Sequence, residues 1–177
     1  MSEKGLTHLY FGNGKGKTTA ALGLALRAAG CGKKVVVVRF LKDWKCGELN
    51  SIALLPNVTV FYGKSTGSVF VRDMSEEDKA ETKAIHDNNL NKALALQQSG
   101  ECDMLVLDEA TDAYQLGVLG NDIFTGLLEN KPEPLELVIT GHKPDEWMIG
   151  KADYVTEMVK HKHPYDKGVS ARVGVEF

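Results

Sequence analysis

Residues 12–19 read Gly12-Asn13-Gly14-Lys15-Gly16-Lys17-Thr18-Thr19, between a predicted strand at Thr7–Phe11 and a predicted helix at Thr18–Ala29. Glycines let successive backbone N–H groups turn toward an anion, the helix N-terminus adds partial positive charge, and Lys17 adds a full one. The Thr18 hydroxyl is a group that Mg²⁺ accepts as a ligand. Although Phe11 stands where the G-x-x-x-x-G-K-[ST] pattern has its first glycine, the stretch predicts a phosphate-binding loop rather than a glycine-rich turn without a ligand.

Outward from this loop, short β-branched runs alternate with longer helical patterns. This order predicts an α/β fold of the P-loop (RecA-like) type, a mostly parallel sheet with helices on both faces. A long helix is expected from the Ser75 cap to Gly100, and a shorter one from about Asn121 to before Pro132. The predicted strands are Thr7–Phe11, Val35–Phe40, Val58–Phe61, Met104–Leu107, Leu135–Thr140 and Tyr154–Met158, with Ser170–Glu176 as a candidate last strand.

The composition is that of an ordinary globular domain. The chain has 177 residues, 43% of them hydrophobic and 25% charged, which predicts one domain over residues 1–177. Its 21 Lys+Arg and 24 Asp+Glu give a net charge of −3, which argues against nucleic acid as a partner. Because the chain shows no apolar span or signal-peptide layout, we expect a cytoplasmic protein with no membrane partner. Three well-separated cysteines (Cys31, Cys46 and Cys102) predict packing residues rather than disulfides or a zinc site.

Two further motifs follow predicted strands. The apolar run Met104–Leu107 ends in Asp108 and Glu109, and an acid at the tip of a strand beside a phosphate loop is typical of an Mg²⁺ site. A solvated strand end is the alternative. Thr140-Gly141-His142 should reach the same carboxyl edge of the sheet, although a Thr-Gly turn after a strand is common.

Other segments bear on ligand binding less directly. Leu41–Asn50 and Gly63–Met74 fit neither helical nor strand periodicity and are candidate ligand-binding loops. The run Lys160-His161-Lys162-His163 has no cysteine nearby, which favours a solvated or anion-facing cluster over a metal site. No motif for a covalent nucleophile stands out, so we expect the chemistry to belong to the substrates.

The loop and the Ala20-Ala21 that follows it resemble the phosphate loop of the ATP:corrinoid adenosyltransferases, which share the non-glycine residue before the loop. The resemblance covers nearly the whole chain in order. It continues through Leu107-Asp108-Glu109, Ile139-Thr140-Gly141, Ala152-Asp153, Thr156-Glu157, Lys162-His163, Asp166, Gly168-Val169, Ala171 and Gly174.

The resemblance implies transfer of the 5′-deoxyadenosyl group of ATP to Co(I) of a reduced corrinoid, cobalamin or cob(I)yrinic acid a,c-diamide, with release of tripolyphosphate. In that family the nucleotide lies reversed in the loop, exposing C5′ to the cobalt. By carry-over, Gly12 to Thr18 hold the triphosphate, with Lys17 and Lys15 balancing its charge, and Thr18 with Asp108 or Glu109 places Mg²⁺ or Mn²⁺. The resemblance also implies a homodimer supplied with electrons by a flavin or flavodoxin-type reductant.

The corrinoid side of the family pattern is matched in part. Phe70 matches an aromatic residue that displaces the lower cobalt ligand, which eases reduction to Co(I), and Arg72 stands where the family has Trp. His142 stands where the family commonly has Arg, so a fixed positive charge is replaced by one that depends on pH. Only a few residues precede the first strand, whereas well-known members carry a long N-terminal arm.

Two other functions share these motifs. A small P-loop nucleoside kinase would use the loop and the strand-end acids to transfer the γ-phosphoryl group. A non-catalytic ATP- or corrinoid-binding carrier or regulator would use nucleotide binding only to order Leu41–Asn50 and Gly63–Met74. Products of ATP turnover distinguish the three.

Overall fold

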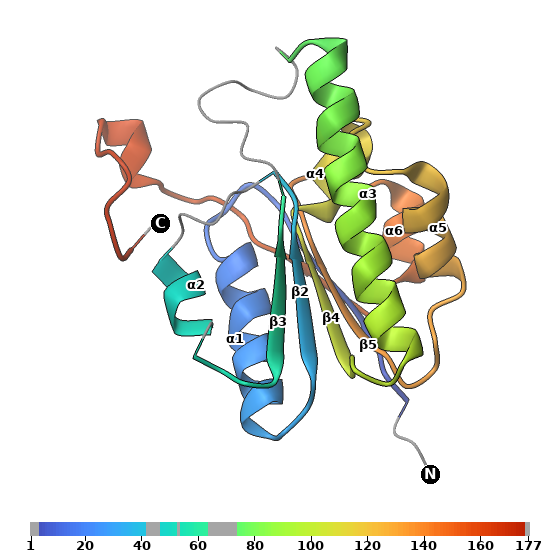
Figure 1. Ribbon diagram of the computed structural model, residues 1–177. Coiled ribbons are helices and arrows are strands. Elements are labelled where there is room, and N and C mark those ends of the chain that lie inside the picture. The colour runs from blue at the N-terminus through green and yellow to red at the C-terminus, as the bar shows by residue number, and fades with distance from the viewer. Residues whose placement is uncertain (1–3, 42–46, 53, 64–73, 176–177) are drawn as a thin grey trace.

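The computed structural model describes residues 4–41, 47–52, 54–63 and 74–175, and these build one six-stranded sheet in the order β3-β2-β4-β5-β1-β6 (Figure 1). Every neighbouring pair is parallel, which confirms the predicted α/β class. The six strands predicted ahead of the candidate last strand all occur, each within one residue of its predicted ends. Their bounds are β1 Thr7–Phe11, β2 Val35–Arg39, β3 Val58–Tyr62, β4 Met104–Asp108, β5 Glu136–Thr140 and β6 Tyr154–Glu157.

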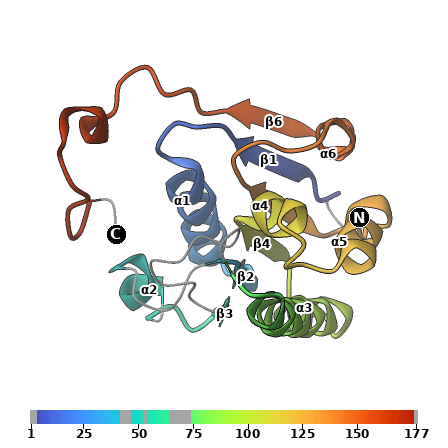
Figure 2. The same cartoon turned by 90° about the horizontal axis from the view of Figure 1, so that it is seen from above.

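Helices cover both faces of this sheet, as predicted. Figures 1 and 2 show α1 and α2 on one face and α3, α4, α5 and α6 on the other. Their bounds are α1 Lys17–Gly30, α2 Gly47–Ile52, α3 Glu76–Gln98, α4 Ala110–Gln115, α5 Asn121–Glu129 and α6 Glu146–Lys151, followed by the 3₁₀ helix η2 Pro164–Lys167.

Two hydrophobic cores result, one on each face of the sheet. The central strand β4 is buried along its whole length and alternates between them: Leu105 and Leu107 pack toward α3 and α5, and Met104 and Val106 toward α1. Side chains of successive strand residues point to opposite faces, so a strand covered on both must be apolar throughout. This explains why the buried strands are continuous apolar runs rather than alternating ones.

The long helix α3 confirms its predicted start, because the Ser75 hydroxyl accepts the Asp78 N–H (3.1 Å) as an N-cap. Inside the core, His86 of this helix is fully buried and its Nδ1 lies 2.7 Å from the Val118 carbonyl oxygen. Burial lowers the pKa of His86, so the ring is neutral and donates from Nδ1. Asn89 donates to the Tyr62 carbonyl (2.6 Å), so polar bonds tie α3 to the end of β3 and to the segment between α4 and α5.

The structure corrects several expectations. Of the predicted strand Ser170–Glu176, residues 170–172 are irregular and residues 173–175 form a turn, all of them exposed, because no neighbouring strand pairs with them. The helix α2 begins inside Leu41–Asn50, where we expected irregular structure; α4 and α6 have six residues each, too few to show a helical period. Cys102 is buried as predicted, Cys31 is exposed, and Cys46 lies outside the described residues.

The chain after β6 bears directly on the site. It runs past the N-terminal end of α1 and then toward α2, at the edge where the strands have their carboxyl ends (Figure 2). Within the described part of the chain, no helix is long and apolar enough to cross a bilayer.

Replacing Gly5 or Gly23 by alanine should change the free energy of unfolding in opposite directions. A Cβ on Gly5 would lie 2.2 Å from the Leu135 carbonyl oxygen, whereas a Cβ on Gly23, an exposed position in α1, meets nothing within 4 Å. We therefore expect Gly5→Ala to lower the free energy of unfolding by about 1–3 kcal/mol through backbone displacement. Gly23→Ala should raise it by about 0.5–1 kcal/mol through helix propensity. Urea unfolding measures both, and a shift in the same direction for the two variants would contradict this packing.

Candidate functional site

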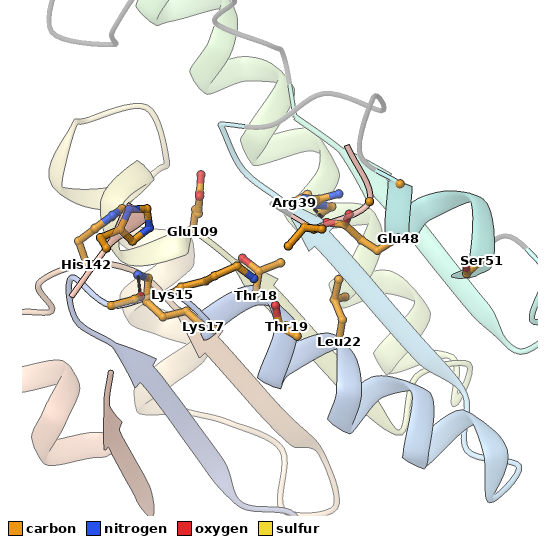
Figure 3. Close-up of a pocket in the computed structure, with 16 residues that line it drawn as sticks. Lys15, Lys17, Thr18, Thr19, Leu22, Arg39, Glu48, Ser51, Glu109 and His142 are labelled. Atoms are coloured by element: carbon orange, nitrogen blue, oxygen red, sulfur yellow. Dashed lines mark hydrogen bonds and ion pairs between the residues drawn. The ribbon is translucent and has the colours of Figure 1, made fainter. Parts of the chain in front are cut away.

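A cavity of about 660 Å³ opens at the carboxyl edge of the sheet (Figure 3). Most of the residues predicted for the site line it: Gly14, Lys15, Gly16, Lys17, Thr18 and Thr19 of the loop, with Glu109 and His142. Gly47 and Glu48 of the lining belong to Leu41–Asn50, a predicted ligand-binding loop, and Gly174 belongs to the family resemblance. The sequence did not single out Leu22 of α1, Arg39 of β2, Ser51 of α2 or Val175 near the C-terminus; His163, expected to face solvent or an anion, lines the cavity too.

The phosphate loop has its glycines for two different reasons. Gly12 and Gly16 have φ values of 113° and 122°, a backbone conformation that side chains disfavour. In addition, a Cβ on Gly12 or Gly14 would lie 2.4 Å or 2.7 Å from the Met158 carbonyl oxygen. The segment after β6 therefore packs directly against the back of the loop.

Lys17 lies across the mouth of this loop. Its Nζ donates to the carbonyl oxygens of Gly12 (2.7 Å) and Gly14 (3.0 Å), which holds the ammonium group above the turn. With the backbone N–H groups at the start of α1, this is the arrangement that binds phosphate groups.

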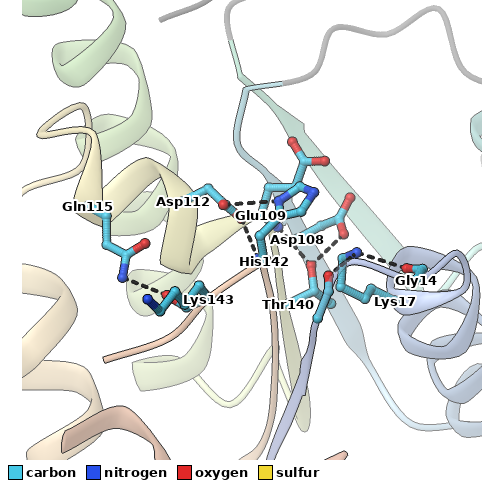
Figure 4. Close-up of polar contacts among 10 residues, drawn as sticks. Gly14, Lys17, Asp108, Glu109, Asp112, Gln115, Thr140, His142 and Lys143 are labelled. Carbon is cyan, nitrogen blue, oxygen red and sulfur yellow. Dashed lines mark hydrogen bonds and ion pairs between the residues drawn. The ribbon is translucent and has the colours of Figure 1, made fainter. Parts of the chain in front are cut away.

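Asp108 is fully buried beneath the loop and joins three neighbouring elements (Figure 4). Its Oδ1 accepts hydrogen bonds from the hydroxyls of Thr18 and Thr140, both at 2.8 Å. The Thr140 hydroxyl also accepts the Glu109 N–H at 2.8 Å. The strand-end threonine thus holds the backbone of Glu109, the second predicted acid, whose φ is 62° where α4 begins.

Arg39 is the buried cation of this edge, and motif analysis missed it. Its side chain is 1% exposed; Nη2 lies 3.1 Å from Glu48 Oε1, and Nε lies 3.5 Å from Asp108 Oδ2. A charge can be buried at this depth only when carboxylates compensate it. A single arginine ending the run Val35–Val38 is the sequence signal that could have identified it.

The oxygens at this edge fit a magnesium ion held together with a nucleotide. A hydroxyl and two carboxylates (Thr18, Asp108 and Glu109) are the hard oxygen donors that Mg²⁺ prefers. Across the described ranges, no group of three or more His, Cys, Asp or Glu could hold a metal ion by itself. An ion at Thr18 and Glu109 would therefore take its other ligands from phosphate oxygens and water, the usual arrangement for Mg²⁺ in nucleotide sites.

His142 brings a titratable charge to the same cavity. Its backbone N–H donates to Asp112 Oδ2 (2.9 Å), and its Nδ1 lies 3.1 Å from Asp112 Oδ1. The side-chain hydrogen bond to Asp112 raises the pKa of His142 above its ordinary value, while burial and the nearby Lys17 oppose the rise. Gly141 must be glycine here, because a Cβ would overlap the Thr111 hydroxyl.

The remaining predicted residues divide into two groups. Asn13 belongs to the loop, but its side chain accepts the Lys160 N–H (2.9 Å) instead of lining the cavity. Phe70 and Arg72, predicted for the corrinoid, lie outside the described residues.

Comparison with known proteins gives the family. Residues 3–177 match the model of the ATP:corrinoid adenosyltransferases BtuR/CobO/CobP. The corrinoid adenosyltransferase of Escherichia coli K12 is 35% identical over 178 residues, covering 100% of this chain and 88% of that protein. The corrinoid adenosyltransferase CobA of Salmonella typhimurium LT2 is 36% identical over 178 residues, with the same coverage. The corrinoid adenosyltransferase of Pseudomonas aeruginosa is 32% identical over 176 residues, covering 99% of this chain and 85% of that protein.

Among solved structures, the Hef helicase domain of Pyrococcus furiosus matches with a TM-score of 0.45 and 12% identity, covering 91% of this chain and 36% of that one. That likeness is too distant to bear on function. The family model and the relatives agree over essentially the whole chain, and they agree with a phosphate loop, strand-end acids and a cavity that joins them. This chain belongs to the ATP:corrinoid adenosyltransferases, the enzymes that transfer the adenosyl group of ATP to a cob(I) corrinoid.

Proposed function

We propose that the cavity beside Lys17 is where this enzyme transfers the 5′-deoxyadenosyl group, with residues 1–177 acting as one catalytic domain. One observation carries the proposal: Lys17, Thr18, Glu109 and His142, from three separate strand ends, line the same cavity. A cationic loop and an oxygen-donor edge facing one space suit a triphosphate whose charge increases as it leaves.

The reaction needs no nucleophile from the protein. Co(I) gives an electron pair to C5′ of ATP, a Co–C bond forms, the C5′–O bond breaks, and its electrons leave with tripolyphosphate. The protein must therefore orient C5′, neutralise the leaving group and exclude water from the reactive cobalt. The backbone N–H groups of Lys15 to Thr18 bind phosphate oxygens in this scheme, and Lys15, Lys17 and protonated His142 compensate the charge.

We assign Mg²⁺ or Mn²⁺ to Thr18 and Glu109. When bound, the ion neutralises part of the charge on the triphosphate. Asp108 acts one step away: its Oδ1 orients the Thr18 hydroxyl, and its Oδ2 faces Arg39. Glu109 lines the cavity, which makes it the better candidate for direct contact with the ion.

Other parts of the proposal rest on family membership and chemistry alone. The natural acceptor is cobalamin or cob(I)yrinic acid a,c-diamide, and a flavin or flavodoxin-type reductant supplies the electrons. The enzyme is a cytoplasmic homodimer. Phe70, with Arg72, closes the lower face of the corrinoid.

An anaerobic assay tests the activity at this site. The protein is mixed with Mg-ATP and chemically reduced Co(I) cobalamin, the visible spectrum is followed, and the phosphate products are separated. We expect a light-sensitive Co–C product in equal amount to tripolyphosphate. Orthophosphate release without alkylcobalt, or phosphorylation of a nucleoside, would instead support the carrier or the kinase.

The loop lysine and the predicted corrinoid aromatic should fail in different ways. Lys17→Ala removes the charge above the loop, so we expect kcat/KM for ATP to fall about 10²- to 10³-fold. Lys33→Ala, an exposed lysine at the opposite edge of the sheet, serves as its control. Phe70→Ala should leave ATP binding nearly intact and slow the reaction that starts from Co(II) with a mild reductant. Equal loss of ATP binding in the Lys17 and Phe70 variants would contradict this separation of roles.

The two strand-end acids should also be separable. Glu109→Gln removes a proposed ligand, so the Mg²⁺ concentration for half-maximal activity should rise about tenfold or more while the melting temperature stays unchanged. Asp108→Asn leaves buried Arg39 less compensated and should cost about 3–5 kcal/mol of stability. Metal titration and urea unfolding of both variants measure this. Similar losses of stability in the two would reject the assignment.

The affinity for ATP should depend on pH through His142. Its pKa is raised, so the cationic form that favours phosphate prevails below that pKa and is lost as pH rises through it. We expect KM for ATP to increase across this interval, above about pH 6.5. His142→Arg should abolish the step, and His142→Gln should keep KM high at every pH. ATP ionises in the same way in the assay of every variant, so a difference between variants reports on His142. If the rise of KM with pH is unchanged in His142→Arg, another group causes it.

A further inference from the structure

The segment after β6 is a part of the molecule that the mechanism above does not use. We call residues 158–175 the C-terminal arm. Its described residues are exposed almost throughout, and none belongs to either hydrophobic core. Exposed apolar side chains include Val159, Tyr165 and Val173. Because burial of apolar surface does not fix the arm, polar contacts must determine where it lies.

Those contacts go to the phosphate loop. The Met158 N–H donates to the Phe11 carbonyl and the Gly14 N–H donates to the Met158 carbonyl, both at 2.7 Å, which continues the pairing of β1 with β6. Two residues further on, the Asn13 side-chain oxygen accepts the Lys160 N–H (2.9 Å). The loop that binds phosphate is therefore also the support on which the arm begins.

The far part of the arm returns to the same cavity. His163, Gly174 and Val175 line it together with the loop residues Lys15 to Thr19. The Nδ1 of His163 accepts the Tyr165 N–H (3.2 Å), so in the neutral ring the proton is on Nε2, which leaves a donor for an anion. Inside the arm, Lys160 pairs with Asp166 (3.1 Å), which links the anchored end to the turn that follows His163.

The charge of the arm suits the same ligand. Residues 158–175 contain Lys160, Lys162, Lys167 and Arg172 against Asp166, a net charge of +3, whereas the whole chain carries −3. The rest of the chain therefore carries −6, and positive charge is concentrated beside the triphosphate site.

We propose that Asn13 is a positioning residue that holds the C-terminal arm in place as the second wall of the nucleotide cavity, with His163 facing the triphosphate. This rests on the proposed function, and it gives Asn13 a task other than direct contact with ATP. Asn13 acts through the arm: its amide oxygen fixes Lys160, and the arm carries His163 to the cavity.

Hydrogen exchange and kinetics on two Asn13 variants test the proposal. In Asn13→Ala, we expect faster exchange of the Lys160 amide and of the arm. We also expect KM for ATP to rise about three- to tenfold, as for one lost hydrogen bond, with kcat much less affected. Asn13→Asp keeps an acceptor oxygen and should restore protection of the Lys160 amide. The melting temperature should stay within about 2 °C, because the arm is outside the cores.

A double-mutant cycle separates a positioning role from direct contact. His163→Ala alone should raise KM for ATP, and in the Asn13→Ala background it should add little, because the arm is already displaced. If the two substitutions raise KM for ATP independently, so that their effects multiply, the proposal is overturned. It is also overturned if the Lys160 amide exchanges at an unchanged rate in Asn13→Ala, or if Asn13→Asp does not restore its protection. If Asn13→Ala does not fold, Asn13→Ser, whose side chain is too short to reach Lys160, takes its place.

Failure of the proposed function would look different. Exchange of the arm is measured on the wild type with and without Mg-ATP and needs no cobalamin. An arm that responds to Asn13 variants in a protein making no alkylcobalt would reject the catalytic assignment alone. If the wild type makes alkylcobalt but Asn13 substitutions leave hydrogen exchange of the arm unchanged, only the positioning role is rejected.

Discussion

The carboxylate of Asp108 is the point on which this molecule depends. It is buried at the end of the central strand β4, and its contacts reach α1 through Thr18, β5 through Thr140 and β2 through Arg39. A buried charge must be compensated, so these elements are held in one relative position. That position also brings the phosphate loop, Glu109 and His142 to one cavity.

Several charged side chains at the cavity have polar partners within the protein. Arg39 lies between Asp108 and Glu48, His142 lies against Asp112, and Lys17 lies on carbonyl oxygens of its own loop. A triphosphate bound here would exchange some of these contacts for new ones. Such preorganisation suits a reaction in which the protein stabilises a leaving group and supplies no nucleophile.

The phosphate loop serves two purposes at once. Its backbone is shaped for an anion on one side, and on the other it packs against Met158, which leaves no space for side chains at Gly12 and Gly14. Glycines in such a loop are usually explained by close approach of the ligand. Here the chain after β6 imposes the same requirement from behind, so loop and arm constrain each other.

Local chemistry made much of this predictable. Apolar runs covered on both faces identified the parallel strands, the Ser75 cap identified the start of α3, and the loop with the acids after β4 identified the carboxyl edge. Short elements such as α4 and α6 escaped because six residues show no period. The candidate strand Ser170–Glu176 did not form because a strand also needs a neighbour to pair with, which a local pattern does not reveal.

The sequence by itself determined the strands, the phosphate loop and the strand-end acids, because each depends on residues adjacent in the chain, and the order of its motifs indicated the family. Only the tertiary structure decided that Arg39 neutralises Asp108 and Glu48, that Asp112 raises the pKa of His142, and that the C-terminal arm forms a wall of the cavity. These contacts join residues far apart along the chain. Their energies depend on burial and distance, and folding alone sets both.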